Sequence, residues 1–240
     1  MIIDFHSHIL PAVDDGSRTV EESVEMLRVM EQQGVDCVVA TPHFYPNKMA
    51  LQEFLRKRDE AYEALTSGNL SGTPFVRCGA EVAFFGNMGR VKQLDCLCIE
   101  NTDLLLIEMP FRNWLAQDIT ELERLVDRGI IPILAHIERY YPFQRSLSVF
   151  RTIAQLPVYL QLNAESFQTF RMRKITSKII GWGSPILLGS DCHNLENRTP
   201  NLSAGREALQ TKYGKGFLQD MDTLGERLLS AERRLVSEAF

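Results

Sequence analysis

The feature that most constrains the fold is a repeated alternation of short apolar runs with longer amphipathic stretches. The apolar runs have the length of strands and are rich in Val, Ile and Leu. This alternation is typical of βα units wound around a parallel sheet. The predicted strands are Ile2–His6, Val35–Thr41, Phe75–Glu81, Asp103–Glu108, Ile131–His136, Val158–Asn163 and Pro185–Asp191.

The first helix is the best marked of those expected between and after the strands. Thr19 and Glu22 form a capping-box pattern, apolar residues follow at helical spacing, and Gly34 ends the helix. Further helices are expected at Lys48–Leu65, Leu202–Gln210 and Phe217–Val236, the last of them sealing the barrel or forming a subunit interface.

Length and composition predict one globular domain over residues 1–240, with 45% hydrophobic and 24% charged residues. A net charge of -5 and the lack of a basic stripe argue against general nucleic-acid binding. Five scattered cysteines form no disulfide framework, which favours a reducing compartment. Because neither an export signal nor a membrane-spanning run is seen, we expect a cytoplasmic protein without membrane insertion.

Residues suited to metal binding fall at or just past the carboxyl ends of the predicted strands. In parallel barrels these ends share one active-site face. One such residue alone is more often a cap or a surface group, so the prediction depends on the joint pattern, which includes every histidine of the chain. A charged group ending a buried strand needs a partner, and a metal ion supplies one. The residues are His6, His8, His43, Glu81, Glu108, His136, Asp191 and His193.

Spacing strengthens the prediction, because side chains two residues apart on a strand point to the same side. His6 with His8, and Asp191 with His193, therefore form two pairs. Asp4 shares the face of the first pair, and we expect it to orient an imidazole.

The motifs taken together resemble the polymerase-and-histidinol-phosphatase (PHP) superfamily. Within it, they are most similar to the manganese-dependent protein-tyrosine phosphatases of bacterial capsule and exopolysaccharide systems. The resemblance runs in order from residue 1 to about residue 200. The motifs are Asp4–His8, Asp14–Gly16, Thr41–His43, Gly79–Glu81, Ile107–Pro110, Ala135–Tyr140 and Gly189–Asn194.

The resemblance implies a distorted (β/α)7 TIM-like barrel of the PHP type that holds three divalent metal ions. It favours manganese, while mixed nitrogen and oxygen ligands also suit iron or zinc. It implies that Asp14 caps the turn before Gly16 instead of binding metal. The implied sites are His6, His8, Glu81 and Asp191 for one ion, Glu81, Glu108 and His136 for a second, and Asp15, His43 and His193 for a third.

The resemblance also places phosphate-binding arginines at Arg139 and Arg198, and a planar guanidinium can hold two phosphate oxygens. For either residue alone, a solvated loop charge is an equally good interpretation. Metal coordination lowers the pKa of bound water to about 7, so hydroxide would serve as the nucleophile without a dedicated protein base.

Some positions depart from the family pattern or imitate another chemistry. Cys192 and Arg198 have the spacing of cysteine-dependent phosphatases, but the segment between them lacks glycine and contains Glu196, so Cys192 is interpreted as a filler. Glu165 adds a carboxylate near the pocket that would repel acidic peptides. Loop aromatics are candidates for an apolar rim, although packing explains at least half: Phe44, Tyr45, Phe84, Phe85, Tyr140 and Tyr141.

The favoured function is hydrolysis of phosphotyrosine in a protein, expected to be the tyrosine-rich tail of a polysaccharide-assembly kinase. A PHP phosphatase acting on a small metabolite such as histidinol phosphate is the nearest alternative. A non-catalytic metal-binding regulator is the second alternative, since fold does not fix function. The oligomeric state stays open.

Overall fold

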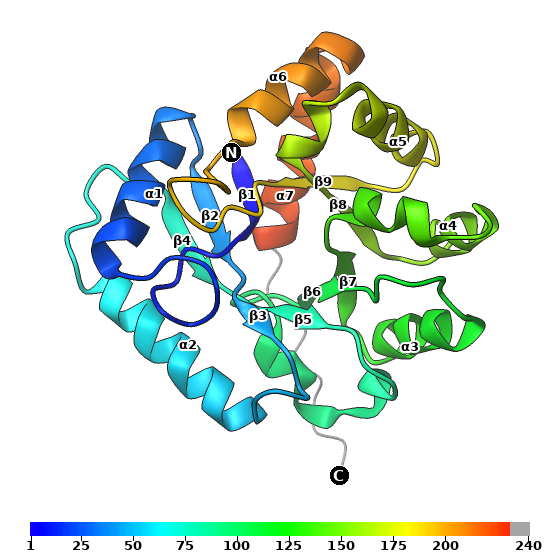
Figure 1. The fold of residues 1–240 in the computed structure, drawn as a ribbon, viewed down its shortest axis with the longest axis horizontal. Coiled ribbons are helices and arrows are strands. Elements are labelled where there is room, and N and C mark those ends of the chain that lie inside the picture. The colour runs from blue at the N-terminus through cyan, green and yellow to red at the C-terminus, as the bar shows by residue number, and fades with distance from the viewer. Residues whose placement is uncertain (231–240) are drawn as a thin grey trace.

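The computed structural model describes residues 1–230, in which parallel strands form a barrel surrounded by helices (Figure 1). Every paired strand is parallel to its neighbour. The strands are β1 (Ile3–Ser7), β2 (Cys37–Ala40), β3 (His43–Phe44), β4 (Phe75–Cys78), β5 (Glu81–Ala83), β6 (Leu104–Glu108), β7 (Ile131–Leu134), β8 (Tyr159–Asn163) and β9 (Ile186–Gly189).

Seven strand positions around the barrel match the seven predicted strands, and two of these positions are broken. One sheet has the order β1-β2-β4 and the other has the order β3-β5-β6-β7-β8-β9. A parallel bridge between Ser7 and Cys192 joins the two sheets at the β1 and β9 edges. The expected distorted (β/α)7 barrel is therefore confirmed.

The breaks correct the predicted ends of the second and third strands. Glu81 was expected to end a strand, but β4 stops at Cys78 and Glu81 begins β5. His43 was expected to follow a strand and instead begins β3. Pro42 lies at the first break, has no N–H for the ladder, and accepts a hydrogen bond from Glu81 N at 3.0 Å. The chain thus passes from one sheet to the other at the positions where the site residues begin.

Helices surround the strands, with the predicted first helix confirmed. Thr19 caps α1 by accepting from Glu22 N at 3.2 Å, whereas the Glu22 carboxylate accepts from Arg18 N. Val236, the predicted end of the last helix, lies outside the described residues. The helices are α1 (Val20–Gln32), α2 (Leu51–Thr66), α3 (Ala116–Asp127), α4 (Ser148–Ile153), α5 (Phe170–Ile180), α6 (Leu202–Tyr213) and α7 (Lys215–Ser230).

Short 3-10 turns complete the connections, and η1 and η2 take the place of a helix between β5 and β6. Across residues 1–230, no helix combines the length and apolar character needed to cross a bilayer. The turns are η1 (Met88–Arg90), η2 (Lys92–Leu97), η3 (Ile137–Phe143) and η4 (Ala164–Phe167).

The core has two parts, because alternate residues of each strand face opposite sides. One set packs under the surrounding helices, as Leu105 and Ile107 of β6 do. The other set fills the barrel interior, as Leu104 and Leu106 do, and includes Leu228 of α7. In Figure 1, α7 lies behind the strands, and it packs against β1 and β9. This helix closes the amino end of the barrel.

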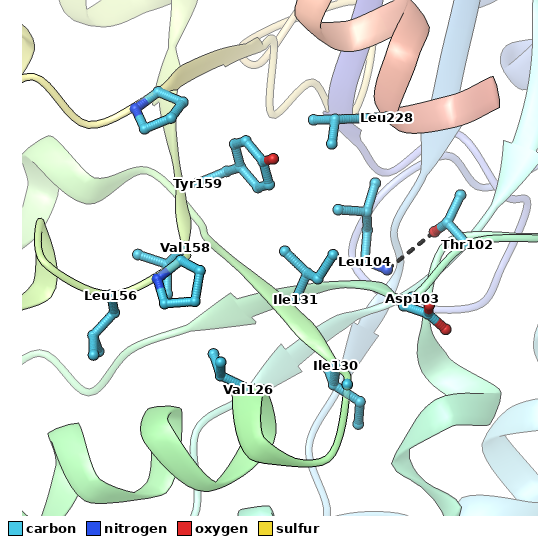
Figure 2. Close-up of a pocket in the computed structure, with 13 residues that line it drawn as sticks. Thr102, Asp103, Leu104, Val126, Ile130, Ile131, Leu156, Val158, Tyr159 and Leu228 are labelled. Carbon is cyan, nitrogen blue, oxygen red and sulfur yellow. Dashed lines mark hydrogen bonds between the residues drawn. The ribbon is translucent and has the colours of Figure 1, made fainter. Parts of the chain in front are cut away.

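A cavity of about 450 Å³ lies at that amino end, between the starts of β6, β7 and β8. Figure 2 shows Leu104, Ile131 and Tyr159 around it, with Leu228 of α7 at its edge. Its lining is mainly apolar and contains none of the predicted site residues. This cavity is thus separate from the end of the barrel where the site residues gather.

Candidate metal centre

All nine predicted ligand residues converge at the carboxyl end of the barrel strands. His6 and His8 come from β1 and the residue after it, while Glu108 ends β6 and the others begin or closely follow their strands. Six of the nine are buried, whereas the Asp15 side chain is 68% exposed at the mouth. The buried six are His6, His8, Glu81, His136, Asp191 and His193.

The donor atoms of the first predicted ligand group, from His6, His8, Glu81 and Asp191, all lie close to one another. The Nε2 atoms of His6 and His8 are 3.1 Å apart, and Glu81 Oε2 lies 3.2 Å from His6 Nε2 and 3.5 Å from His8 Nε2. Asp191 Oδ1 lies 3.5 Å from the first nitrogen and 3.4 Å from the second. These donor atoms come from β1, β5 and the segment after β9, so the closed barrel is required to bring them together.

The second predicted group shares Glu81 through its other oxygen. His136 Nε2 lies 3.0 Å from Glu81 Oε1 and 3.7 Å from Glu108 Oε1. His43 approaches the same carboxylate, with its Nδ1 at 2.8 Å from Glu81 Oε2. Glu81 is therefore the central residue of the cluster, contacted by imidazoles on several sides.

The third predicted group forms the outer part of the cluster. Asp15 Oδ1 lies 3.6 Å from His43 Nε2 and also 3.6 Å from His193 Nε2. The His8 ring stacks beside His193 with centroids 3.8 Å apart, and this contact joins the outer group to the first one. The three groups are thus continuous.

The donor set fits divalent cations. Ligands bound at about 2.1 Å to one ion and adjacent to each other are about 3.0–3.4 Å apart, which is near the spacing in the first group. Two Nε2 atoms that face each other need a proton or a cation between them. His193 Nε2 is buried and has no hydrogen-bond partner within residues 1–230. Nitrogen and carboxylate donors without thiolate suit manganese, iron or zinc.

Gln161 of β8 orients two of the cluster residues, and the sequence analysis did not identify it. Its Oε1 lies 3.0 Å from His6 Nδ1 and accepts from His136 N at 2.6 Å. Because the amide oxygen can only accept, His6 carries its proton on Nδ1 and directs the Nε2 lone pair into the cluster. A Gln inside the apolar run of β8, two residues before Asn163, was the available signal.

Asp14 fixes the tautomer of His8 in the way that Gln161 fixes the tautomer of His6. Its Oδ2 lies 2.6 Å from His8 Nδ1 and accepts from His43 N at 2.8 Å. Its Oδ1 accepts from Gly16 N at 2.9 Å, so the predicted cap of this turn is confirmed. Asp14 thus directs His8 Nε2 toward the cluster.

Asp4 corrects an expectation, because it binds backbone and no imidazole. Its Oδ1 accepts from His6 N at 3.2 Å and from Ser190 N at 2.9 Å. Its side chain points to the backbone that joins β1 to the end of β9, while Gln161 occupies the position beside the His6 ring. Burial raises the pKa of Asp4 to about 6.

Two site residues have positive φ angles, which are unfavourable for residues other than glycine. His136 has φ 30° and Asp191 has φ 55°. Hydrogen bonds hold both backbones, from His136 N to Gln161 and from Asp191 N to His6 O at 2.8 Å. Asn163 Nδ2 also donates to Asp191 Oδ2 at 2.8 Å. The barrel therefore imposes these conformations on the two side chains.

Burial and charge set the ionisation of the cluster. Burial opposes the charge on His6, but Glu81 and Asp191 outweigh it and raise the pKa of His6. Burial also opposes ionisation of Asp191, but His6 and His8 outweigh it and hold the pKa of Asp191 well below its ordinary value. Burial lowers the pKa of His136. The carboxylate of Asp191 and the neutral imidazole of His136 are the forms that coordinate a cation.

Both predicted arginines reach the edge of the cluster. Arg198 Nη2 donates to Asp191 Oδ1 at 2.7 Å, and Arg139 Nη1 lies 3.4 Å from Asp191 Oδ2. They come from different segments, after β9 and after β7, yet meet at one carboxylate. Each guanidinium is partly exposed, with further N–H groups that point away from this contact.

Comparison with known proteins supplies the family. The family model for capsular polysaccharide synthesis proteins CpsB/CapC matches residues 2–225. The chain belongs to the CpsB/CapC family. The resemblance predicted from the motifs is therefore confirmed, and the match extends beyond the last motif.

Relatives in the CpsB/CapC family carry phosphatase names. The tyrosine-protein phosphatase CpsB of Streptococcus pneumoniae is 26% identical over 228 residues, covering 89% of this chain and 91% of that protein. The tyrosine-protein phosphatase YwqE of Bacillus subtilis (strain 168) is 26% identical over 226 residues, covering 89% of this chain and 85% of that protein.

Solved structures agree on the fold. A structure from a study of YwqE and CpsB, described as metal-dependent tyrosine phosphatases, superposes with a TM-score of 0.80 at 23% identity, covering 95% of this chain and 94% of that one. Histidinol phosphate phosphatase from Lactococcus lactis gives a TM-score of 0.51 at 13% identity, covering 88% and 93%. Both likenesses concern the architecture alone.

In this CpsB/CapC chain, Cys192 is unsuited to act as a nucleophile. The residue is fully buried, and burial raises the pKa of the Cys192 thiol well above its ordinary value. A phosphatase cysteine acts as an exposed thiolate of lowered pKa. The interpretation of Cys192 as a filler agrees with this environment. Glu165, the other departure, is exposed on η4.

Most of the six candidates for an aromatic rim pack against the core, as expected for at least half of them, and Phe84, Phe85 and Tyr141 do so while partly exposed. Phe44 is buried, and Tyr140 is completely buried beneath the loop that follows β6. Their rings pack against Phe54 and Phe111, so they belong to the core below the site. The aromatic residues exposed beside the cluster are Phe111 and Phe143, which the sequence analysis did not identify. Phe111 directly follows the motif Ile107–Pro110, so its place after a ligand-bearing strand was an available signal.

Proposed function

We propose that this chain is a metal-dependent phosphatase that hydrolyses phosphotyrosine in proteins. The observation that carries the proposal is the largely buried cluster of histidines and acidic residues, with two arginines at its edge, at the carboxyl end of the barrel. The tyrosine-protein phosphatase names of CpsB and YwqE support the substrate class.

The proposed metal sites are the three ligand groups that the family resemblance implies, with manganese as the favoured ion. Glu81 is shared between the first and second sites because each of its oxygens faces a different set of imidazoles. The proposed ligands are His6, His8, Glu81 and Asp191 for one ion, Glu81, Glu108 and His136 for another, and Asp15, His43 and His193 for the third.

Divalent ions bound here would polarise phosphoryl oxygens and lower the pKa of water at the site. Gln161 and Asp14 hold His6 and His8 in the tautomers that present Nε2 to the cluster. Arg139 and Arg198 donate N–H groups to two oxygens of the phosphoryl group and position it beside Asp191.

The cellular context is the last part of the proposal. The whole chain of 240 residues acts as one catalytic domain in the cytoplasm. Its substrate is a phosphotyrosine protein of a capsule or exopolysaccharide system, in particular the tyrosine-rich tail of the assembly kinase. The capsular polysaccharide family supports this setting.

The test combines metal analysis with a substrate comparison. Hydrolysis of a phosphotyrosine peptide should stop when a chelator removes the metal and return when manganese is added. The intact enzyme should prefer this peptide to histidinol phosphate by about tenfold or more in kcat/KM. Full activity after verified metal removal would contradict the proposal, and a preference for histidinol phosphate would assign the chain to metabolite hydrolysis.

A further inference from the structure

Exposed apolar side chains are concentrated on two loops beside the metal centre. One loop, residues 109–115, follows β6, and the other, residues 143–147, begins with the last residue of η3. Phe111 is 41% exposed and Phe143 is 44% exposed, and Leu115 and Leu147 on the same loops are exposed as well. Surface patches of this kind mark binding sites more often than isolated apolar residues do.

Hydrogen bonds tie the two loops into one surface. The Gln144 side chain accepts from Trp114 N at 3.0 Å and donates to Arg112 O at 2.9 Å. Arg145 N donates to Asn113 Oδ1 at 2.9 Å. A surface whose backbone is fixed in this way binds a partner with a smaller loss of conformational entropy.

This surface is in direct contact with residues of the proposed catalytic site. The Phe111 ring stacks on the His136 imidazole with centroids 5.9 Å apart and planes at 19°. The Arg139 guanidinium carbon lies 5.4 Å from the centre of the Phe111 ring, while Nη1 of the same side chain reaches Asp191. On its other side, Phe111 meets Phe143 edge-on at 5.7 Å.

We propose that these two loops bind the phosphotyrosine-bearing segment of the substrate, with Phe111 and Phe143 against its phenyl ring. The proposal rests on the function proposed above. In phosphotyrosine the phenyl ring is joined to phosphorus through one ester oxygen, so a phosphoryl group held by Arg139 brings the ring within reach of Phe111, whose ring centre lies 5.4 Å from the Arg139 guanidinium carbon. Aromatic rings pack well in edge-to-face and offset contacts. Arg145, exposed on the second loop, adds positive charge suited to an acidic flanking residue.

A cavity next to the metal centre is an alternative binding site for the phenyl ring of the substrate. This cavity of about 220 Å³ lies beside Asp15 and His43 and is also lined by Tyr45 and Met49. Lys48 already covers the Tyr45 ring, with its Nζ 4.1 Å from the ring centre. Both arginines contact Asp191, and neither they nor Asp191 line this cavity, which favours the loop surface.

The test uses the manganese-loaded enzyme, with a phosphotyrosine peptide as substrate and inorganic phosphate as a ring-free inhibitor. Phe143→Ala and Phe111→Ala should each lower kcat/KM for the peptide by about tenfold, while the inhibition constant for phosphate changes by less than about twofold. Phe143→Ala is decisive, because Phe143 packs on Phe111 and, within residues 1–230, its ring stacks on none of the proposed histidine ligands. Phe75→Ala, at a 79% exposed site in β4, is the control and should match the wild type.

Two results would overturn the inference. The first is a wild-type kcat/KM in Phe143→Ala, above all if Met49→Ala lowers it, since that would place the ring in the cavity beside Asp15. The second is an equal weakening of peptide and phosphate, which would mean that the phenylalanines support only the metal site. Failure of the proposed function would look different, because the wild type itself would leave the peptide intact with manganese present.

Discussion

The two ends of the barrel are built from the same strands but differ in almost every physical property. At the amino end, Leu104 and Ile131 line an apolar cavity that α7 covers with Leu228. At the carboxyl end, β6 finishes in Glu108, and buried imidazoles and carboxylates crowd within 4 Å of each other. One end resembles an ordinary protein core, whereas the other concentrates groups that are unfavourable to bury.

The difference between the two ends indicates that the amino end provides stability and the carboxyl end provides the chemistry. Positive φ angles at His136 and Asp191 cost of order 1–3 kcal/mol each, and such strain persists only when the surroundings enforce it. The apolar interior and the α7 cover provide the rigid frame that enforces it. Substitutions at the two ends should therefore separate activity from stability.

The largest expected effect is the loss of activity in His136→Ala. Removing this imidazole deprives the second proposed metal site of its only nitrogen ligand, and a metal contributes several kcal/mol to the transition state. The value of kcat/KM for a phosphotyrosine peptide should fall by about a thousandfold or more. Steady-state kinetics with manganese, alongside a circular dichroism spectrum that matches the wild type, checks this. Retention of even a tenth of the activity would remove His136 from the catalytic centre.

Leu104→Ala is the corresponding test at the amino end, where we expect a loss of stability without a loss of activity. Leu104 is buried in the barrel interior beside the existing cavity, so its truncation enlarges an apolar void. The free energy of unfolding should fall by about 2–5 kcal/mol, measured with urea. At temperatures where the variant is folded, kcat/KM should equal that of the wild type. A variant that is stable but inactive would contradict the division between the two ends.

The sequence predicted the frame and the residues that gather at its carboxyl end, because both depend on local patterns. Most of these residues lie at or just past the ends of apolar strands, and parallel strands bring such ends together regardless of sequence separation. His6 and Asp191, 185 positions apart, meet at 3.5 Å for this reason. The seven-stranded barrel followed from the same alternation.

The residues that the sequence did not reveal act through neighbours in space. Gln161 touches His6 and His136, which lie 155 and 25 residues away, and no local pattern encodes that contact. Asp4 was assigned to an imidazole because strand periodicity gives the face of a side chain but not its partner. The breaks before β3 and β5 depend on the change of strand partners, which likewise requires the folded chain.

Gln161→Leu tests whether the amide network of β8 supports the metal site. Leucine keeps the approximate volume but cannot accept from His6 Nδ1 or His136 N, so the His6 tautomer is no longer fixed. Manganese affinity should weaken by about 10–100-fold, the usual range for residues that orient metal ligands. A metal-competition titration measures this independently of activity.

The matched control is Gln155→Leu, at an exposed position before β8, which should bind manganese as the wild type does. Gln161→Glu should partly restore the affinity lost in Gln161→Leu, because a carboxylate oxygen can still accept from His6. Equal affinity in Gln161→Leu and the wild type would mean that Gln161 merely fills space.

The last prediction concerns Glu138, a fully buried carboxyl group just behind the cluster. Its Oε1 accepts from Ser166 Oγ at 2.6 Å and from Asn163 N at 3.2 Å, while its Oε2 has no hydrogen-bond partner in residues 1–230. Burial raises the pKa of Glu138 from 4.5 to about 7. In the folded protein, this carboxyl group therefore keeps its proton at pH values where the unfolded chain has lost it.

The sign of the effect follows from proton counting. Between pH 4.5 and about 7 the unfolded state binds fewer protons at Glu138, so this residue's contribution to the free energy of unfolding falls as pH rises. Below pH 4.5 the loss is absent, and above about pH 7 it is complete, at about 3–4 kcal/mol. Glu138→Gln removes this dependence, so the variant should gain stability relative to the wild type as pH increases from 5 to 8.

The informative quantity is how the difference in unfolding free energy between Glu138→Gln and the wild type changes with pH. Its absolute size is less informative, because the new amide nitrogen would occupy the position of the unpartnered Oε2 and shift stability by the same amount at every pH. Urea unfolding in chelator at each pH measures this difference without a contribution from metal binding. Glu165→Gln, at an exposed carboxyl group on η4, reports the effect of removing a surface charge. A flat difference between Glu138→Gln and the wild type would mean that Glu138 ionises freely despite its burial, and that the polar carboxyl end of the barrel is better solvated than its structure implies.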